Sequence, residues 1–192
     1  METLATIRQR ALENKVPIMS LDSIEFVTNA LNQHRAVSIL EIGTAVGFSA
    51  CALVDKNPDF RIDTVERDEI RYSEALENIA ALNYQDKIHA HLSDAFDFQV
   101  DRVYDGLIID AAKAQNLAFF RLFFPYTDKV CIIDNMNYHG FTDESGYQEI
   151  RSRRIRQMVS KIRVFKEYLA SRSDLIVEHY DVGDGITIVR RK

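Results

Sequence analysis

Cysteine is scarce in this chain: only Cys51 and Cys131 occur among 192 residues, far apart and each within an apolar stretch. This spacing fits neither a disulfide framework nor a zinc-ligand motif, so we interpret both as buried thiols of a reducing compartment. Apolar runs long enough to cross a bilayer are also missing. Residues 1–14 carry charges throughout, so we expect no signal peptide and a cytoplasmic protein.

Glycine and proline are few, seven and three, and no repeat or flexible linker interrupts the chain. We therefore predict a single domain over 1–192, with N-terminal helices within 1–35 packing on it. From residue 37 on, strands alternate with helices, which predicts a mostly parallel sheet covered on both faces. The turn Gly183-Asp184-Gly185 predicts a closing hairpin, so at least one terminal strand is antiparallel. The expected strands are 37–42, 61–65, 88–92, 104–109, 130–133, 175–180 and 186–190, and the expected helices are 3–14, 20–33, 48–55, 69–82, 116–124 and 148–170.

Glycines and acids follow the first three strands, where a sheet of this kind binds its ligands. Gly43 and Gly47 allow a tight turn and a close approach of the backbone to a ligand. Glu66 ends the second strand, where an acid accepts hydrogen bonds from a ribose diol, and Asp94 follows the third, within reach of an adenine amino group. Since the spacing is not that of a pyrophosphate-binding loop, the pattern suits S-adenosylmethionine better than NAD. The alternative is a plain turn beside solvated strand ends.

Oxygen ligands follow the fourth and fifth strands, which are neighbours in a doubly wound sheet. Asp110 ends one strand, and Asp134 and Asn135 end the other. Two carboxylates and an amide favour a hard cation such as Mg²⁺, or else Mn²⁺ or Ca²⁺. Lys113 is placed to pair with these carboxylates or to act as a base. The alternative is that both aspartates cap the helices that follow and that Lys113 forms a structural ion pair.

Histidine contributes no predicted chemistry. His89 and His91 alternate along the expected third strand and share a face, so we interpret both as structural. His139 is alone in a polar loop, and we interpret it as a surface residue.

Positive charge is concentrated in one segment of a chain whose formal net charge is −5. Residues 151–166 hold seven of the 24 Arg and Lys residues and no acid, which leaves 17 basic against 29 acidic residues, or −12, elsewhere. Arginine on an exposed helix face binds phosphate through two hydrogen bonds, so the segment predicts RNA binding. The alternative is a solvated helix face. The predicted RNA-binding residues are Arg153, Arg154, Arg156, Lys161 and Arg163.

Six short segments occur in a characteristic order: Val16-Pro17-Ile18-Met19, Glu41-Ile42-Gly43-Thr44-Ala45, Glu66-Arg67-Asp68, Ile109-Asp110-Ala111-Ala112-Lys113, Ile133-Asp134-Asn135 and Val182-Gly183-Asp184-Gly185. In order and spacing they resemble the bacterial cation-dependent O-methyltransferases, the family that includes animal catechol O-methyltransferase. The resemblance implies an α/β Rossmann-like class I methyltransferase fold, with a seven-stranded, mostly parallel sheet and a reversed last strand. It further implies S-adenosylmethionine as methyl donor, a divalent metal and a homodimer.

The resemblance also implies residue roles. Asp110, Asp134 and Asn135 would bind the metal, and Lys113 with Asp110 would be catalytic. The expected cofactor-binding residues are Met19, Glu41, Gly43, Thr44, Gly47, Ser49, Glu66, Arg67, Asp94, Ala95 and Asp110.

The acceptor is the least determined part of the prediction. Asp110-Ala111-Ala112-Lys113-Ala114-Gln115 and Arg153-Arg154-Ile155-Arg156 resemble the family members that methylate wobble 5-hydroxyuridine in tRNA to 5-methoxyuridine. That likeness implies the tRNA anticodon loop as partner, whose bases are easily unstacked. The chain departs from the family pattern at 126–129 and 136–138, and the second departure adjoins the expected substrate mouth. Two alternatives are a small-molecule catechol or phenol O-methyltransferase and a non-catalytic RNA-binding protein on the same fold.

Overall fold

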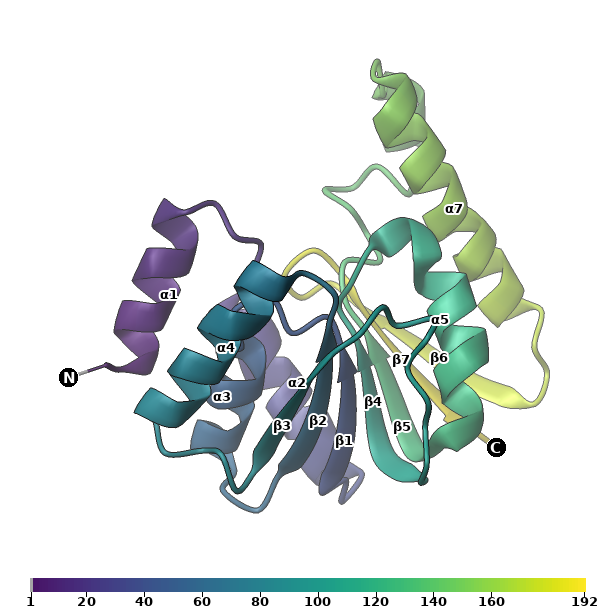
Figure 1. Ribbon diagram of the computed structural model, residues 1–192. Coiled ribbons are helices and arrows are strands. Elements are labelled where there is room, and N and C mark those ends of the chain that lie inside the picture. The colour runs from purple at the N-terminus through teal and green to yellow at the C-terminus, as the bar shows by residue number, and fades with distance from the viewer. Residues whose placement is uncertain (1) are drawn as a thin grey trace.

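A seven-stranded sheet forms the centre of the computed structural model, which describes residues 2–192 (Figure 1). The strand order is β3-β2-β1-β4-β5-β7-β6. Strands β1 to β5 are parallel, whereas β7 is antiparallel to both β5 and β6. The predicted fold class, with its reversed last strand, is therefore confirmed. The strands are β1 (Ser38–Ile42), β2 (Arg61–Glu66), β3 (Ile88–Leu92), β4 (Tyr104–Ile109), β5 (Thr127–Ile133), β6 (Leu175–Tyr180) and β7 (Ile186–Arg191).

Helices cover both faces of this sheet because the central strands are apolar on both sides. In β1, Ile39 joins the core beneath α1, α2, α3 and α4, whereas Leu40 and Ile42 join the core beneath α5 and α7. Figure 1 shows these two groups of helices on opposite sides of the sheet. The helices are α1 (Leu4–Glu13), α2 (Leu21–Gln33), α3 (Phe48–Lys56), α4 (Glu69–Ala81), α5 (Asn116–Phe123), α6 (Glu144–Glu149) and α7 (Arg153–Ala170).

The predicted helix over 148–170 is wrong at its beginning, where two helices meet. Ile150 leaves the helical conformation after α6, with ψ at 113°. Ser152 then begins α7 as its N-cap, and its hydroxyl accepts a hydrogen bond from the Ile155 amide at 3.4 Å. The helical periodicity continues through this stretch, but Ser152 caps a new helix and so divides the predicted one in two. In Figure 1 the N-terminal half of α7 extends beyond the sheet and beyond helices α1 to α5.

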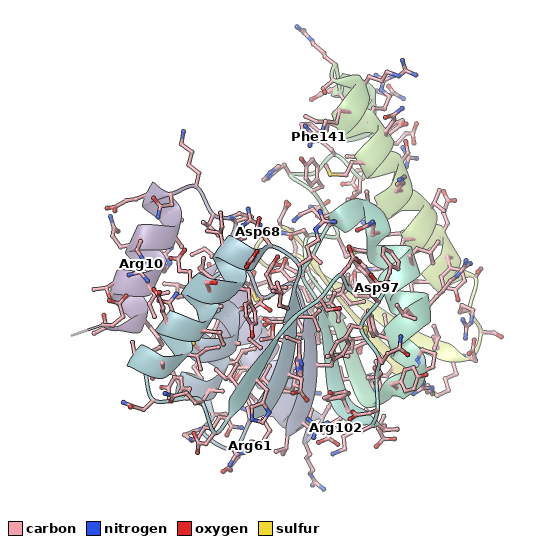
Figure 2. All side chains as sticks on the ribbon, viewed as in Figure 1. Arg10, Arg61, Asp68, Asp97, Arg102 and Phe141 are labelled. Atoms are coloured by element: carbon pink, nitrogen blue, oxygen red, sulfur yellow. The ribbon has the colours of Figure 1, made fainter. Side chains whose placement is uncertain are left out.

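The two ends of the sheet differ in what they carry. Arg61 begins β2 and Arg102 precedes β4, and Figure 2 shows both at the amino ends of the parallel strands. The carboxyl ends of β1 to β5 lie at the opposite end, together with the turn between β6 and β7, because β7 runs antiparallel to β5. Among the described residues, no helix is long and apolar enough to span a membrane.

Candidate functional site

A cavity of about 740 Å³ opens at the carboxyl ends of the parallel strands, where the sequence predicts the ligand site. It is lined by most of the predicted site residues, which come from the loops after β1, β2, β3, β4 and β5. Two predicted cofactor residues, Glu41 and Gly47, do not line it. The predicted cofactor residues that do are Met19, Gly43, Thr44, Ser49, Glu66, Arg67, Asp94, Ala95 and Asp110.

The two glycines after β1 are required by packing within the protein. Gly43 has φ +107°, and a Cβ added there would lie 2.2 Å from the carbonyl oxygen of Asp110. Gly47 has φ +77° as the N-cap of α3, and a Cβ there would lie 3.3 Å from the Cβ of Ala75. The sequence suggested that Gly47 lets the backbone approach a ligand. In the structure it lets α3 pack closely against α4.

Glu41 lies behind the cavity wall. Its carboxylate is fully buried and accepts hydrogen bonds from the hydroxyls of Ser49 and Thr64, both at 2.6 Å. While the Glu41 carboxylate is ionised, the one proton of Thr64 points to it, so the Thr44 hydroxyl, 2.6 Å from that of Thr64, donates to Thr64. Ser49 and Thr44 line the cavity and therefore offer it lone pairs. Burial, opposed by these hydrogen bonds, raises the pKa of Glu41 to about 7.

Glu66 is held rigidly at the end of β2. Its carboxylate accepts hydrogen bonds from the backbone amides of Ala45 at 2.8 Å, Arg67 at 3.0 Å and Asp68 at 2.9 Å. It remains at the cavity surface, so the oxygens keep lone pairs for a ligand. Asp94 lines the cavity after the neighbouring strand β3, and its carboxylate lies 3.8 Å from the guanidinium of Arg67.

Two carboxylates, the buried Asp134 and the half-buried Asp110, influence each other at the other end of the cavity. Burial and the charge of Asp110 together raise the pKa of Asp134 to about 7. Burial also raises the pKa of Asp110, while the ammonium of Lys113 acts in the opposite direction. Asn135 and Lys113 line the same region. Across residues 2–192, no three His, Cys, Asp or Glu side chains gather to hold a metal.

The helix-cap alternative for the two aspartates is wrong. The residues at the N-cap positions after β4 and β5 are Gln115 for α5 and Asp143 for α6. Asp110 and Asp134 instead end their strands inside the cavity wall.

The cavity has a further wall that the sequence analysis missed. Tyr138 and His139 line it from the loop after β5, and Gly183 and Asp184 line it from the turn between β6 and β7. His139 is 72% exposed, as expected of a surface residue, but it stands at the cavity mouth. The hairpin turn was predicted from its glycines, but the pairing of β7 with β5, which brings this turn to the carboxyl end of β5, was not.

Other histidines lie away from the cavity. His89 and His91 are 3.6 and 3.1 Å from the buried carboxylate of Asp63, which also binds Arg102 and Tyr104. Although burial acts the other way, hydrogen bonds from His91 and Tyr104 and the charge of Arg102 hold the pKa of Asp63 well below its usual range.

The five predicted RNA-binding residues divide into two groups. Arg156 donates to the Ile150 carbonyl at 2.6 Å, and Arg163 pairs with Glu144 at 2.7 Å, so both hold α6 against α7. In contrast, the exposed side chains of Arg153, Arg154 and Lys161 form no ion pair or hydrogen bond with any other described residue.

The seven-stranded sheet with its reversed strand β7, and the cavity at the carboxyl ends of its parallel strands, define a Rossmann-like methyltransferase fold. Residues 1–192 match the model of the O-methyltransferase family, and the chain belongs to that family. The predicted enzyme class, an S-adenosylmethionine-dependent O-methyltransferase, is thereby confirmed.

Three relatives illustrate the similarity. A proposed caffeoyl-CoA O-methyltransferase from Staphylococcus aureus is 30% identical with a TM-score of 0.91, over 100% of this chain and 93% of that one. An O-methyltransferase from Bacillus cereus, solved with SAH, is 24% identical with a TM-score of 0.83, over 98% and 90%. The flavonoid 3',5'-methyltransferase of Vitis vinifera is 26% identical over 86% of this chain and 75% of its own length. A relative from Aspergillus flavus is matched over only 33% of its length.

Proposed function

We propose that this enzyme transfers the methyl group of S-adenosylmethionine to the 5-hydroxyl of wobble 5-hydroxyuridine in tRNA, giving 5-methoxyuridine. The observation that carries the choice of acceptor is the group of unpaired cations on α7, Arg153, Arg154 and Lys161, on a helix that extends beyond the body of an otherwise acidic protein (Figure 1).

The cofactor would occupy the β1–β3 side of the cavity, whose volume suits a nucleoside-sized ligand. Glu66 would accept hydrogen bonds from the ribose hydroxyls, and Asp94 one from the adenine amino group. Ser49 and Thr44 would accept from the ammonium of the methionine part, because Glu41 and Thr64 take their protons. The remaining lining residues of this side are Met19, Gly43, Arg67, Ala95 and Asp110.

A divalent cation, Mg²⁺ in our proposal, would be held by Asp110, Asp134 and Asn135. The donor set fits a hard cation because it is made only of oxygen, and because a cation would offset the repulsion between the charges of Asp110 and Asp134. When bound, such an ion orients an acceptor hydroxyl and increases its acidity.

Methyl transfer then needs an in-line approach and the removal of one proton. A lone pair of the acceptor oxygen forms the new O–C bond while the C–S bond breaks, and that electron pair stays on sulfur. We propose Lys113 as the group that accepts the hydroxyl proton, because its side chain lines the acceptor side of the cavity near Asp110.

RNA would be bound by three of the five residues predicted for it. Arg153, Arg154 and Lys161 are free to contact phosphates, whereas Arg156 and Arg163 hold α6. An anticodon loop is a suitable substrate because its bases can be unstacked and inserted into a cavity. The homodimer and the cytoplasmic location remain predictions.

A small-molecule acceptor is the second candidate. It is favoured by the similarity to a flavonoid methyltransferase, which covers 86% of this chain. A catechol and 5-hydroxyuridine each offer a second oxygen next to the reacting hydroxyl, so the proposed metal site accepts either.

The test is transfer of radiolabel from S-adenosylmethionine to tRNA bearing 5-hydroxyuridine and, in parallel, to a free catechol, each with and without EDTA. We expect EDTA-sensitive label in tRNA, and a loss of RNA affinity in the triple variant Arg153→Gln, Arg154→Gln, Lys161→Gln. Each lost phosphate contact lowers the slope of log affinity against log salt by about 0.7–0.9, so the slope should fall by about 2. The matched control replaces Lys87 and Lys192, which flank the amino ends of the parallel strands. Label in the catechol alone would contradict the RNA proposal.

A further inference from the structure

The loop that follows β5 has an unusual backbone. Over 135–140, which we call the acceptor loop, three residues with side chains have positive φ: Asn135 at 58°, Tyr138 at 44° and His139 at 57°. Residues that carry a Cβ disfavour this region for steric reasons, and such conformations persist only where the surroundings impose them. The loop leads directly from the proposed metal ligand Asn135 to Tyr138 and His139 at the cavity mouth.

The turn between β6 and β7 is what holds the acceptor loop. The amide of Met136 donates to the carbonyl of Gly185 at 2.8 Å, and the amide of Asn137 donates to the carbonyl of Asp184 at 2.9 Å. The amide of His139 donates to the Asp184 carboxylate at 2.5 Å, the only side chain among these acceptors. Asp184 is 17% exposed, so this charged hydrogen bond is partly shielded from water.

The turn is itself fixed by close contacts. A Cβ at Gly183 would lie 2.2 Å from the Ser23 hydroxyl on α2, and one at Gly185 would lie 2.6 Å from the Cβ of Asn137. The turn therefore fits tightly between the start of α2 and the acceptor loop. Figure 2 shows Phe141, which follows the loop, beside α7 and far from Arg61 and Arg102 at the other end of the sheet.

We propose that Asp184 is a positioning residue for the acceptor: its carboxylate holds the His139 amide, and thereby the left-handed acceptor loop that presents Asn135, Tyr138 and His139 to the substrate. The inference rests on the proposed function only in placing the acceptor at the Asp110–Asp134–Asn135 side of the cavity. It applies to a tRNA base and to a catechol alike.

The first test compares Asp184→Ala, Asp184→Asn and the control Asp181→Ala, an exposed acid in the same connection. Asparagine keeps an oxygen that can accept from the His139 amide, whereas alanine does not. For whichever acceptor the wild type methylates, we expect Asp184→Ala to lower kcat/KM about tenfold or more, mainly through a raised acceptor KM. Asp184→Asn should recover most of this loss, and the dissociation constant for SAH should stay within about twofold in all variants. A loss that asparagine does not recover would assign the effect to charge and overturn the proposal.

A second measurement does not depend on activity. Amide hydrogen exchange of Asn137 and His139 should accelerate in Asp184→Ala and stay unchanged in Asp181→Ala. The loss of kcat/KM caused by Asp184→Ala should shrink more in a His139→Gly background than in a His139→Ala background. Both backgrounds lose the imidazole, which lies 3.5 Å from the Asp184 carboxylate, but only glycine adopts positive φ without support. Unchanged hydrogen exchange, or equal losses of kcat/KM in the two backgrounds, would refute the positioning role of Asp184 even if the enzyme methylates tRNA. If the Asp184 variants behave as expected but no label enters tRNA, only the proposed acceptor is refuted.

Discussion

Glutamate at position 41 makes the stability of this protein depend on pH in a direction opposite to that of most surface acids. Its carboxyl is fully buried, and its two hydrogen bonds from Ser49 and Thr64 compensate only part of the cost of burying a charge. Its pKa rises from the ordinary 4.5 to about 7, with burial as the largest cause. The folded chain thus binds this proton more tightly than the unfolded chain does.

The size of the effect follows from that difference. A rise from 4.5 to about 7 corresponds to about 3 kcal/mol of unfolding free energy. This contribution is present in full below pH 4.5 and is lost as the pH rises through about 7. Replacing Glu41 by Gln removes the titration while keeping the shape, so the variant should lack this loss. Buried Asp134 contributes in the same direction, but it is present in both proteins and cancels in the comparison.

The assay is urea unfolding of the metal-free and cofactor-free protein at several values between pH 4.5 and 8.5. The difference in unfolding free energy, wild type minus Glu41→Gln, should fall by about 3 kcal/mol across this range. Glu77→Gln, on the exposed side of α4, serves as the control and should give a flat difference. Parallel curves for wild type and Glu41→Gln would refute the reasoning, because Glu41 would then titrate alike in the folded and unfolded chains.

Two further predictions concern the cavity wall. Gly43→Ala should destabilise the fold by about 2–4 kcal/mol, because its Cβ would overlap the Asp110 carbonyl oxygen. The control is Gly140→Ala, at φ +80° with nothing within 4 Å of the added Cβ, which measures the cost of the backbone conformation alone. Equal losses of unfolding free energy in urea for the two variants would contradict the contact argument. Asp134→Asn should raise the melting temperature of the metal-free protein, because it removes one of two carboxylates that repel each other. It should also abolish stabilisation by Mg²⁺, which for the wild type is about 2.7 kcal/mol at 100 times Kd. A thermal shift with Mg²⁺ that the variant retains would exclude Asp134 as a ligand.

The positions of the central strands were predictable because they contain short apolar runs bounded by polar turns, such as 107–109 in β4 and 130–133 in β5. The same rule placed Glu66, Asp94, Asp110 and Asp134 at one end of the sheet, since parallel strands bring their carboxyl ends together. Tyr138 and Asp184 were not predicted as lining residues. Their position depends on β7 inserting between β5 and β6, and that pairing joins segments about 50 residues apart. No local pattern in the sequence specifies it.

Glu41 marks the boundary between what residue spacing can and cannot indicate. In β1, side chains alternate, so Glu41 shares the face of Ile39, toward α3, and not the face of Ile42. Spacing therefore brings Glu41 close to the loop after β1 but cannot say whether its carboxylate reaches the cavity. That depends on Ser49, whose place in the first turn of α3 puts its hydroxyl between Glu41 and the cavity. The same holds for the charge on α7. Seven basic residues predict a basic surface, but the sequence does not show that Arg163 pairs with Glu144 and stacks on Tyr147. Composition thus predicts which chemical groups are present in a region, and the tertiary contacts determine which of them are free to act.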